Sequence, residues 1–172
     1  MKYNFCPCCK NDLVPVIDAG KEYQGCSDRK DCGFIHFNCP DPVAVGVVPK
    51  HNAGELELLL VQRGFNLEDG VGKWALPGGF VDSFEDPKQA MIRELKEETG
   101  LEGKVLRTID ITNPLPGKMN RNLVYFELEV DDYSILKKTD ETLNYGFFNS
   151  NNLPEMAFPD HKRIVEEYLS SH

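Results

Sequence analysis

Three glutamates with helical spacing are the residues whose types and positions most clearly suggest chemistry. Glu94, Glu97 and Glu98 fall close together on one side of a predicted helix, where their negative charges repel one another. Divalent cations such as Mg²⁺ take oxygen ligands and would remove that repulsion. The spacing alone therefore indicates either a divalent-metal site or a solvated acidic face.

Six cysteines form the second group, and all of them lie within the first 39 residues. They are Cys6, Cys8, Cys9, Cys26, Cys32 and Cys39. Cys6 and Cys9 form a C-x2-C pair, whereas Cys26 and Cys32 form a longer C-x5-C pair. Soft thiolates saturate tetrahedral Zn²⁺, so two such pairs joined by a hairpin-forming segment predict a structural zinc ribbon.

Three further side chains keep the zinc ligand set open. Cys8 and Cys39 could replace one of the four cysteines or be small, partly buried thiols, and His36 offers a nitrogen ligand. Residues 1–40 hold five basic and five acidic residues, a balance that gives no phosphate-attracting patch. Pro40-Asp41-Pro42 ends the cysteine-rich segment. We therefore predict a zinc ribbon over residues 1–40 and a second domain over residues 41–172.

Composition narrows the class of protein. The 172 residues carry a net charge of -9, with 41% apolar and 27% charged residues, which is a globular composition and excludes a disordered or fibrous chain. The acidic balance argues against nucleic-acid and anionic-membrane partners. No apolar run approaches the roughly 20 residues needed to cross a bilayer, and the first residues do not resemble a signal peptide. We therefore expect a cytoplasmic protein with reduced thiols.

The elements that must position these groups alternate between strands and helices. Strands are predicted over Val43–Val48, Glu55–Arg63, Lys104–Thr112, Arg121–Val130 and Asn144–Asn149. Turn residues at 51–54 predict that the first two strands form a hairpin, and residues 160–169 have the pattern of an amphipathic helix. The sum predicts an α/β fold with a mixed or largely antiparallel sheet.

The helix that carries the three glutamates has clear end signals. Asp86 is a good N-cap, Pro87 suits the first helical position, and Gly100 suits a left-handed C-terminal residue. Met91, Ile92 and Leu95 share one apolar face of this helix.

This segment carries a recognisable signature. Its pattern is Gly79-x5-Glu85-x7-Arg93-Glu94-Leu95-x-Glu97-Glu98-x-Gly100-Leu101, which resembles the Nudix box at every fixed position. The resemblance implies the Nudix α/β/α sandwich and hydrolysis, dependent on Mg²⁺ or Mn²⁺, of a nucleoside diphosphate linked to another moiety. It implies a nucleotide-type small-molecule substrate, and relatives often form homodimers.

The resemblance also implies roles for individual residues. Glu94, Glu97 and Glu98 become the Mg²⁺ ligands, and the carbonyl of Gly78 becomes an additional ligand. Arg93 and Glu85 orient the helix and its acids. Gly79 gives the backbone freedom for the turn.

Two residues outside the box keep alternative interpretations. Glu98, Glu97 and the downstream Glu141 are candidates for the catalytic base, and an exposed loop acid is the other interpretation of Glu141. Arg63, at the end of a predicted strand, is a candidate phosphate contact or an ordinary exposed arginine.

Ribbon and box together resemble the zinc-ribbon branch of Nudix proteins, which includes ADP-ribose/FAD pyrophosphatases and NADH pyrophosphatases. The NADH-type Ser-Gln-Pro-Trp motif is missing from the sequence, whereas Pro116 has the ADP-ribose-type spacing, although a turn explains one proline equally well. We expect ADP-ribose or an FAD-like dinucleotide as substrate. The alternatives are an NADH pyrophosphatase, a hydrolase of oxidised nucleoside triphosphates, and a nucleic-acid-binding or ligand-sensing regulator.

Overall fold

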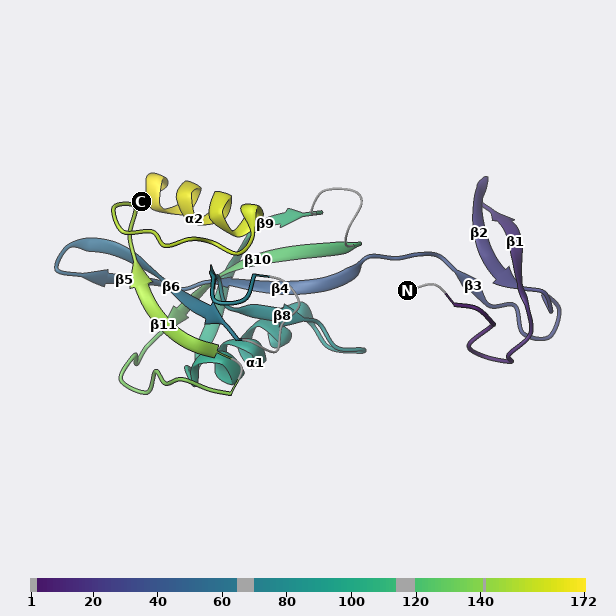
Figure 1. The fold of residues 1–172 in the computed structure, drawn as a ribbon, viewed down its shortest axis with the longest axis horizontal. Helices are drawn as coiled ribbons and strands as arrows, with labels where there is room; N and C mark the ends of the chain where they lie inside the picture. The colour runs from purple at the N-terminus through teal and green to yellow at the C-terminus, as the bar shows by residue number, and fades with distance from the viewer. Residues whose placement is uncertain (1–2, 65–69, 114–119, 141) are drawn as a thin grey trace. The chain divides into compact units, whose positions relative to one another are not determined.

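The chain divides into two compact units, Met1–Pro40 and Asp41–His172 (Figure 1). The computed structural model describes residues 3–64, 70–113, 120–140 and 142–172. The predictions on Glu141 and Pro116 fall outside these residues. Within the described ranges, none of the helices has the length and apolar character that crossing a membrane requires.

The first unit is a small antiparallel sheet with the order β1-β2-β3. Its strands are β1 (Leu13–Asp18), β2 (Lys21–Cys26) and β3 (Ile35–His36). Ala19 and Gly20 join β1 to β2 with positive φ angles of 45° and 77°, which suit a tight hairpin turn between right-twisted strands. Apart from Gly25, the buried residues described in this unit are Cys6 and Cys26. The cysteines therefore take the place of an apolar core.

The second unit holds two four-stranded sheets, with the orders β8-β4-β10-β9 and β11-β6-β5. In chain order the elements are β4 (Asp41–Val47), β5 (Pro49–Asn52), β6 (Glu55–Arg63), β7 (Trp74–Ala75), β8 (Gly78–Phe80), α1 (Pro87–Thr99), β9 (Gly103–Thr112), β10 (Arg121–Val130), β11 (Thr142–Phe148) and α2 (Pro159–Ser171). β4 and β10 are parallel, whereas the other paired strands are antiparallel, and β7 adds to β6. The predicted α/β class with a mixed sheet is confirmed.

Alternating side chains of the central strands build two apolar cores. On β6, Leu59 packs in the core with α1, whereas Leu58 and Leu60 pack in the core with α2. β4 alternates in the same way, with Ala44 on the α1 side and Val45 on the α2 side. A strand buried on both faces is apolar throughout, which explains the continuous apolar runs. Figure 1 shows α1 and α2 on opposite sides of the strands, an α/β/α sandwich.

The prediction that residues 43–48 and 55–63 form a hairpin is wrong, because the second segment pairs with a different strand. β6 pairs with β5, through Pro49↔Leu58 to Asn52↔Glu55, whereas β4 pairs with β8 and β10 in the other sheet. The chain passes between the sheets at Val48, whose carbonyl still accepts the N–H of Leu59 at 3.0 Å. One apolar run therefore contains both a strand and the crossing to a second sheet.

Candidate active site and metal centre

The ends of α1 are fixed by the caps that the sequence predicts. The Asp86 side chain accepts the N–H of Lys88 at 2.8 Å, and Pro87 occupies the first turn. Gly100 has a φ of 74°, and its N–H donates to the carbonyl of Lys96 at 2.8 Å. These local interactions set where the helix begins and ends, and hence where its acidic residues lie.

Arg93 is the centre of the charged network on α1. Its guanidinium forks onto Glu85, with Nε to Oε1 and Nη2 to Oε2 both at 2.9 Å, a paired geometry that fixes direction as well as distance. Nη2 also donates to the Phe80 carbonyl at 3.0 Å. Nη1 lies between two carboxylates, 2.6 Å from Oε1 of Glu94 and 2.9 Å from Oε2 of Glu97. The network joins β8, the loop before α1 and the helix itself.

The charge of Glu85 is strongly stabilised in this network. The hydrogen bonds from Arg93, followed by the backbone N–H of Asp82, lower the pKa of Glu85 to about 2. The same carboxylates raise the pKa of Arg93 above its usual value. The pair therefore keeps both charges at any ordinary pH, as a fixed brace for the helix.

Glu94 is the buried member of the three glutamates, with only 9% of its surface exposed. Its carboxylate lies against Gly79, where an added Cβ would be 2.5 Å from Cδ of Glu94. The structure thus assigns Gly79 a steric role rather than the backbone freedom expected from the sequence. The unusual backbone belongs to Gly78, which has a φ of 149° and would place a Cβ 2.2 Å from the Ala44 carbonyl.

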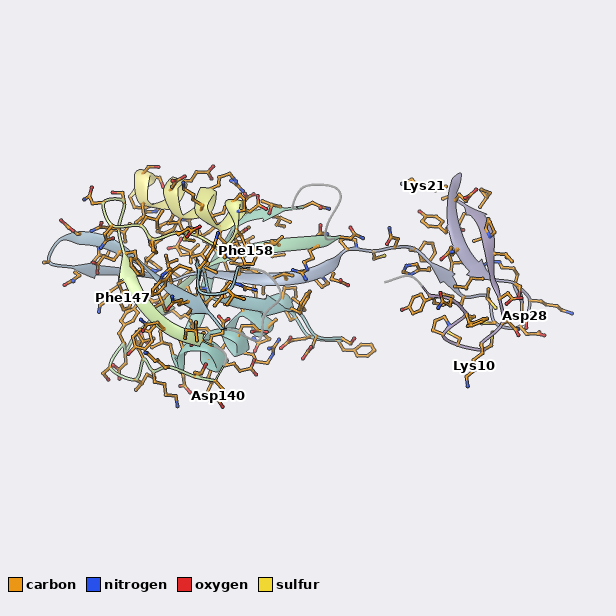
Figure 2. All side chains as sticks on the ribbon, in the orientation of Figure 1. Lys10, Lys21, Asp28, Asp140, Phe147 and Phe158 are labelled. Carbon is orange, nitrogen blue, oxygen red and sulfur yellow. The ribbon has the colours of Figure 1, made fainter. Side chains whose placement is uncertain are left out.

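Glu98 connects α1 to two other segments. Its Oε2 accepts the N–H of Gly78 at 2.9 Å. Its backbone carbonyl accepts the hydroxyl hydrogens of Thr142 at 3.1 Å and Thr139 at 3.3 Å. Figure 2 labels Asp140, between these two threonines, beside α1. The end of the helix is therefore held by β8 on one side and by the start of β11 on the other.

The three glutamates do not close into a compact ligand cluster. Among the described residues, the one group of three or more Asp, Glu, His or Cys ligand atoms within 4.8 Å of one another consists of the four cysteines. Glu94 and Glu97 instead face the same nitrogen of Arg93, while Glu98 faces Gly78. One carboxylate oxygen of Glu94 and one of Glu97 thus already accept hydrogen bonds from the positively charged Arg93 guanidinium. A bound divalent cation would supply positive charge to the same kind of oxygen.

Arg63 lies at the end of β6, half-buried rather than exposed. Its guanidinium carbon is 4.7 Å from the ring centre of Phe158, and its backbone pairs with Thr142 at the start of β11. Figure 2 shows Phe158 beside the first turn of α2. Arg63 therefore shares a strand pair with the segment that contacts Glu98, whereas its guanidinium packs toward α2.

The cysteine centre consists of Cys6, Cys9, Cys26 and Cys32, as the sequence predicts. The sulfurs of Cys6 and Cys32 are 3.6 Å apart, and those of Cys9 and Cys26 are 3.4 Å apart. Burial raises the pKa of the Cys6 thiol, but hydrogen bonds from the backbone of Cys9 and Cys8 and from the thiols of Cys9 and Cys32 together lower the pKa to about 6.

Local turns shape the two cysteine pairs. The Asp28 carbonyl accepts the N–H groups of Cys32 at 3.3 Å and Gly33 at 3.1 Å, which closes the longer C-x5-C loop. His36 packs its ring against Tyr3, with the ring centres 5.1 Å apart. Cys8 and Cys39 are exposed and lie outside the four-sulfur group.

Sequence reasoning missed the residues that brace the site from a distance. Thr139 and Thr142 reach Glu98 across 41 and 44 residues, and His161 reaches Leu76 across 85 residues. No local spacing links such partners, because sheet pairing and helix packing bring them together. The one sequence signal was that Thr139 and Thr142 flank Asp140 and the candidate Glu141.

The chain resembles known proteins over nearly its whole length. An ADP-ribose pyrophosphatase from Methanocaldococcus jannaschii is 33% identical over 168 residues, covering 95% of each chain. An asymmetrical bis(5'-nucleosyl)-tetraphosphatase from Mus musculus is 28% identical over 79% of this chain and 90% of its own. The fold matches that of a NUDIX hydrolase from Nitrosomonas europaea with a TM-score of 0.81 and 21% identity, covering 99% of this chain and 92% of the other.

The family assignment follows from the match over the second unit. The NUDIX domain model covers residues 40–168, which include β4 to β11, most of α2 and the whole Arg93 network. In the structure, Arg93 hydrogen-bonds Glu85 and joins the residues of the motif around α1. The fold is the α/β/α sandwich that the resemblance implied. The chain belongs to the NUDIX domain family.

Proposed function

We propose that this protein is a Mg²⁺-dependent pyrophosphatase that hydrolyses ADP-ribose to AMP and ribose 5-phosphate. The observation that carries the substrate is the 33% identity to an ADP-ribose pyrophosphatase over 95% of both chains. In the reaction, water attacks one phosphorus of the diphosphate and the bond from that phosphorus to the bridging oxygen breaks. The bridging oxygen leaves with the other phosphate, so each product carries one terminal phosphate, and two protons are released when both products are dianions.

The charged network supports the metal-dependent chemistry. Nudix hydrolases use divalent metals such as Mg²⁺. Such an ion supplies positive charge to the diphosphate oxygens and lowers the pKa of a bound water. Glu94, Glu97 and Glu98 are the proposed oxygen donors, with the carbonyl of Gly78 as a fourth. These residues fit Mg²⁺ because hard cations prefer carboxylate oxygens as ligands. Two of the carboxylates, those of Glu94 and Glu97, already interact with a positive group, Nη1 of Arg93.

The remaining residues have proposed roles around these donors. Arg93 and Glu85 hold α1 in place through their paired hydrogen bonds, and Gly79 leaves room for the Glu94 carboxylate. Glu97, Glu98 and Glu141 are the candidates to take the proton from the attacking water. Arg63 is the proposed substrate contact, because the residue is partly exposed and its guanidinium carries a positive charge that attracts a phosphate.

We also propose that the four cysteines bind one structural Zn²⁺. Tetrahedral zinc with Zn–S bonds of about 2.3 Å places its sulfurs about 3.8 Å apart. The shorter contacts of 3.4 and 3.6 Å, and the limit of 4.8 Å for all four sulfurs, fit that geometry. Four thiolates leave no open position for a substrate, so this zinc would not act in catalysis. On this basis residues 1–40 are a zinc ribbon and residues 41–172 the Nudix hydrolase domain.

A hydrolysis panel tests the proposed substrate. ADP-ribose, FAD, NADH, diadenosine tetraphosphate and nucleoside triphosphates are each assayed with Mg²⁺ and with Mn²⁺, and the products are separated by chromatography. We expect ADP-ribose to have the highest kcat/KM. Diadenosine tetraphosphate is the second candidate, because a tetraphosphatase is 28% identical over 79% of this chain. A clear preference for any other compound would overturn the ADP-ribose assignment.

Two further properties stay predictions. If the protein is a homodimer, analytical ultracentrifugation should give a mass twice that of the 19.5 kDa chain. A monomer mass at the concentrations used for the assays would contradict the predicted homodimer. A cytoplasmic location is the expectation from the cysteine content, and fractionation of cells that express the protein tests it.

A further inference from the structure

His161 is a buried titratable residue that neither sequence motif includes. It lies in the first turn of α2 and is 6% exposed, whereas His36, His51 and His172 are partly or fully exposed. Buried histidines need a hydrogen-bond partner for each polar atom, or they destabilise the fold. The position of His161 therefore calls for a structural reason or a functional one.

The contact that His161 makes fixes its chemical state. Its Nδ1 lies 3.2 Å from the backbone nitrogen of Leu76, and both groups are buried. A backbone N–H can only donate, so Nδ1 is the acceptor and the ring is the neutral form with its proton on Nε2. Burial, and then the positive charge of Arg63, lower the pKa of His161 to about 3. The ring therefore stays an acceptor over the whole range in which the enzyme would act.

Leu76, Pro77 and Gly78 are successive residues, and each makes a hydrogen bond to a different helix or strand. The N–H of Leu76 donates to His161 on α2, and the carbonyl of Pro77 accepts the N–H of Gly46 on β4 at 2.8 Å. The N–H of Gly78 then donates to Oε2 of Glu98 on α1 at 2.9 Å. The first and the third of these bonds therefore lie on one short segment, two residues apart.

His161 also contacts the other side of the candidate site. Its ring centre is 5.0 Å from that of Phe158, and the guanidinium carbon of Arg63 lies 4.7 Å from the centre of the same Phe158 ring. One side chain on α2 is thus linked both to the Gly78–Glu98 hydrogen bond and to the aromatic ring that supports Arg63.

We propose that His161 is a positioning residue of the active site, whose Nδ1 holds the Leu76–Gly78 segment and so aims the Gly78 backbone at Glu98. This inference rests on the proposed function. His161 touches neither substrate nor metal in this role. Its effect passes through one backbone hydrogen bond, and the geometry of a metal-binding carboxylate depends on such support.

Substitutions of His161 can separate the effect of the Nδ1 hydrogen-bond acceptor from the effect of the packing of the side chain. In His161→Asn, Oδ1 takes the place of Nδ1, but the ring contacts are lost and an amide is buried. In His161→Gln the acceptor moves one bond further out. In His161→Leu the apolar bulk stays and the acceptor is lost. A packing role predicts that Leu is the best replacement, whereas positioning predicts that Asn is the best.

The experiment measures kcat and KM for ADP-ribose, Mn²⁺ affinity by electron paramagnetic resonance, and the thermal unfolding midpoint. For His161→Gln and His161→Leu we expect kcat to fall about tenfold or more with KM little changed, and Mn²⁺ to bind about threefold more weakly. His161→Asn should stay within about threefold of the natural protein in kcat, although its unfolding midpoint is lower than that of His161→Leu.

Two control variants separate positioning from general destabilisation. Ile164 lies on the same helix, in the apolar core that also contains Leu76, so Ile164→Val should lower the midpoint without changing kcat. His51→Gln, at an exposed position on β5, should change neither. If His161→Leu does not fold, the comparison of the Asn and Gln variants still decides the question.

Two results would overturn the positioning role. One is that the Asn variant is as slow as the Gln variant, and the other is that all folded variants keep the natural kcat and Mn²⁺ affinity. A natural protein without ADP-ribose hydrolysis would overturn the proposed function instead, and the Mn²⁺ affinities would then still test His161.

Discussion

The two units of this protein are stabilised in different ways. In the first, apart from a glycine, the buried residues described are two cysteines of the four-sulfur group. In the second, two apolar cores fill the space between the strands and the helices. A unit of about 40 residues rarely folds on apolar burial alone, whereas a domain three times as long does. The proposed zinc is thus part of a fold, whereas the proposed magnesium is added to one that is already formed.

Removing the zinc should give the largest difference between the units. Structural zinc sites contribute about 10–16 kcal/mol of apparent binding free energy, so Cys6→Ser should lose the metal and unfold residues 3–40. The second unit should keep its own unfolding transition. Metal analysis and amide NMR spectra of the full chain measure both effects, with one equivalent of zinc expected for the natural protein.

Cys39→Ser is the matched control for that experiment, because Cys39 is exposed and outside the four-sulfur group. It should keep the full zinc content. Full zinc content in Cys6→Ser as well would show that the ligand set is wrong. Collapse of both units together would contradict the separation between a metal-held and a core-held fold.

Acid should weaken the core-held unit through His161. The pKa of His161 is lowered to about 3 by burial and then by Arg63, so between that value and about 6.5 the unfolded chain binds the extra proton. The free energy of unfolding therefore falls as the pH falls through this window. From pH 6.5 to pH 4 the expected loss is about 3 kcal/mol, because one pKa unit corresponds to about 1.4 kcal/mol.

Denaturant unfolding at a series of pH values measures this loss in the natural protein and in His161→Asn. The variant lacks the titrating ring, so its stability should change less over the same window. Equal slopes for the two proteins would show that acid destabilises this unit through other groups.

Neutralising the acidic side of α1 should act on catalysis rather than on folding. Glu97→Gln and Glu98→Gln are each expected to lower kcat by about 10²- to 10³-fold at saturating Mg²⁺. Glu97 is exposed, so the free energy of unfolding should change by less than about 1 kcal/mol in its variant. Steady-state kinetics and denaturant titration measure the two effects separately.

Glu102→Gln provides the control, because Glu102 is exposed just beyond α1 and pairs with Lys96 at 2.7 Å. Its turnover should equal that of the natural protein. Undiminished turnover in both the Glu97 and the Glu98 variants would remove the basis for the magnesium site.

The parts of the molecule that sequence could predict are those set by local interactions. Asp86 and Gly100 cap α1 through bonds to residues two and four positions away, so the helix is readable from its own segment. The cysteine pairs are also short-range patterns, and the four sulfurs meet as predicted. β7 and β8 were missed because strands of two or three residues carry too little pattern to detect.

The remaining features depend on distant partners. The pairing of β6 with β5 instead of β4 was mispredicted because one apolar run, from Val43 to Val48, also contains the crossing between the sheets. The steric role of Gly79 needs the Glu94 carboxylate, which comes from another element. The hydrogen bond between His161 and Leu76 joins residues 85 positions apart, and a buried histidine in an amphipathic helix has no distinguishing signal in the sequence.

A magnesium titration tests the central claim most directly. The full zinc-loaded chain is incubated with ADP-ribose while Mg²⁺ is added and then removed with a chelator too weak to extract the zinc. We predict equal amounts of AMP and ribose 5-phosphate only while Mg²⁺ is present, with a constant zinc content and an unchanged amide spectrum. Turnover that follows the zinc content instead of Mg²⁺, or no cleavage of ADP-ribose at any Mg²⁺ concentration, would contradict the account.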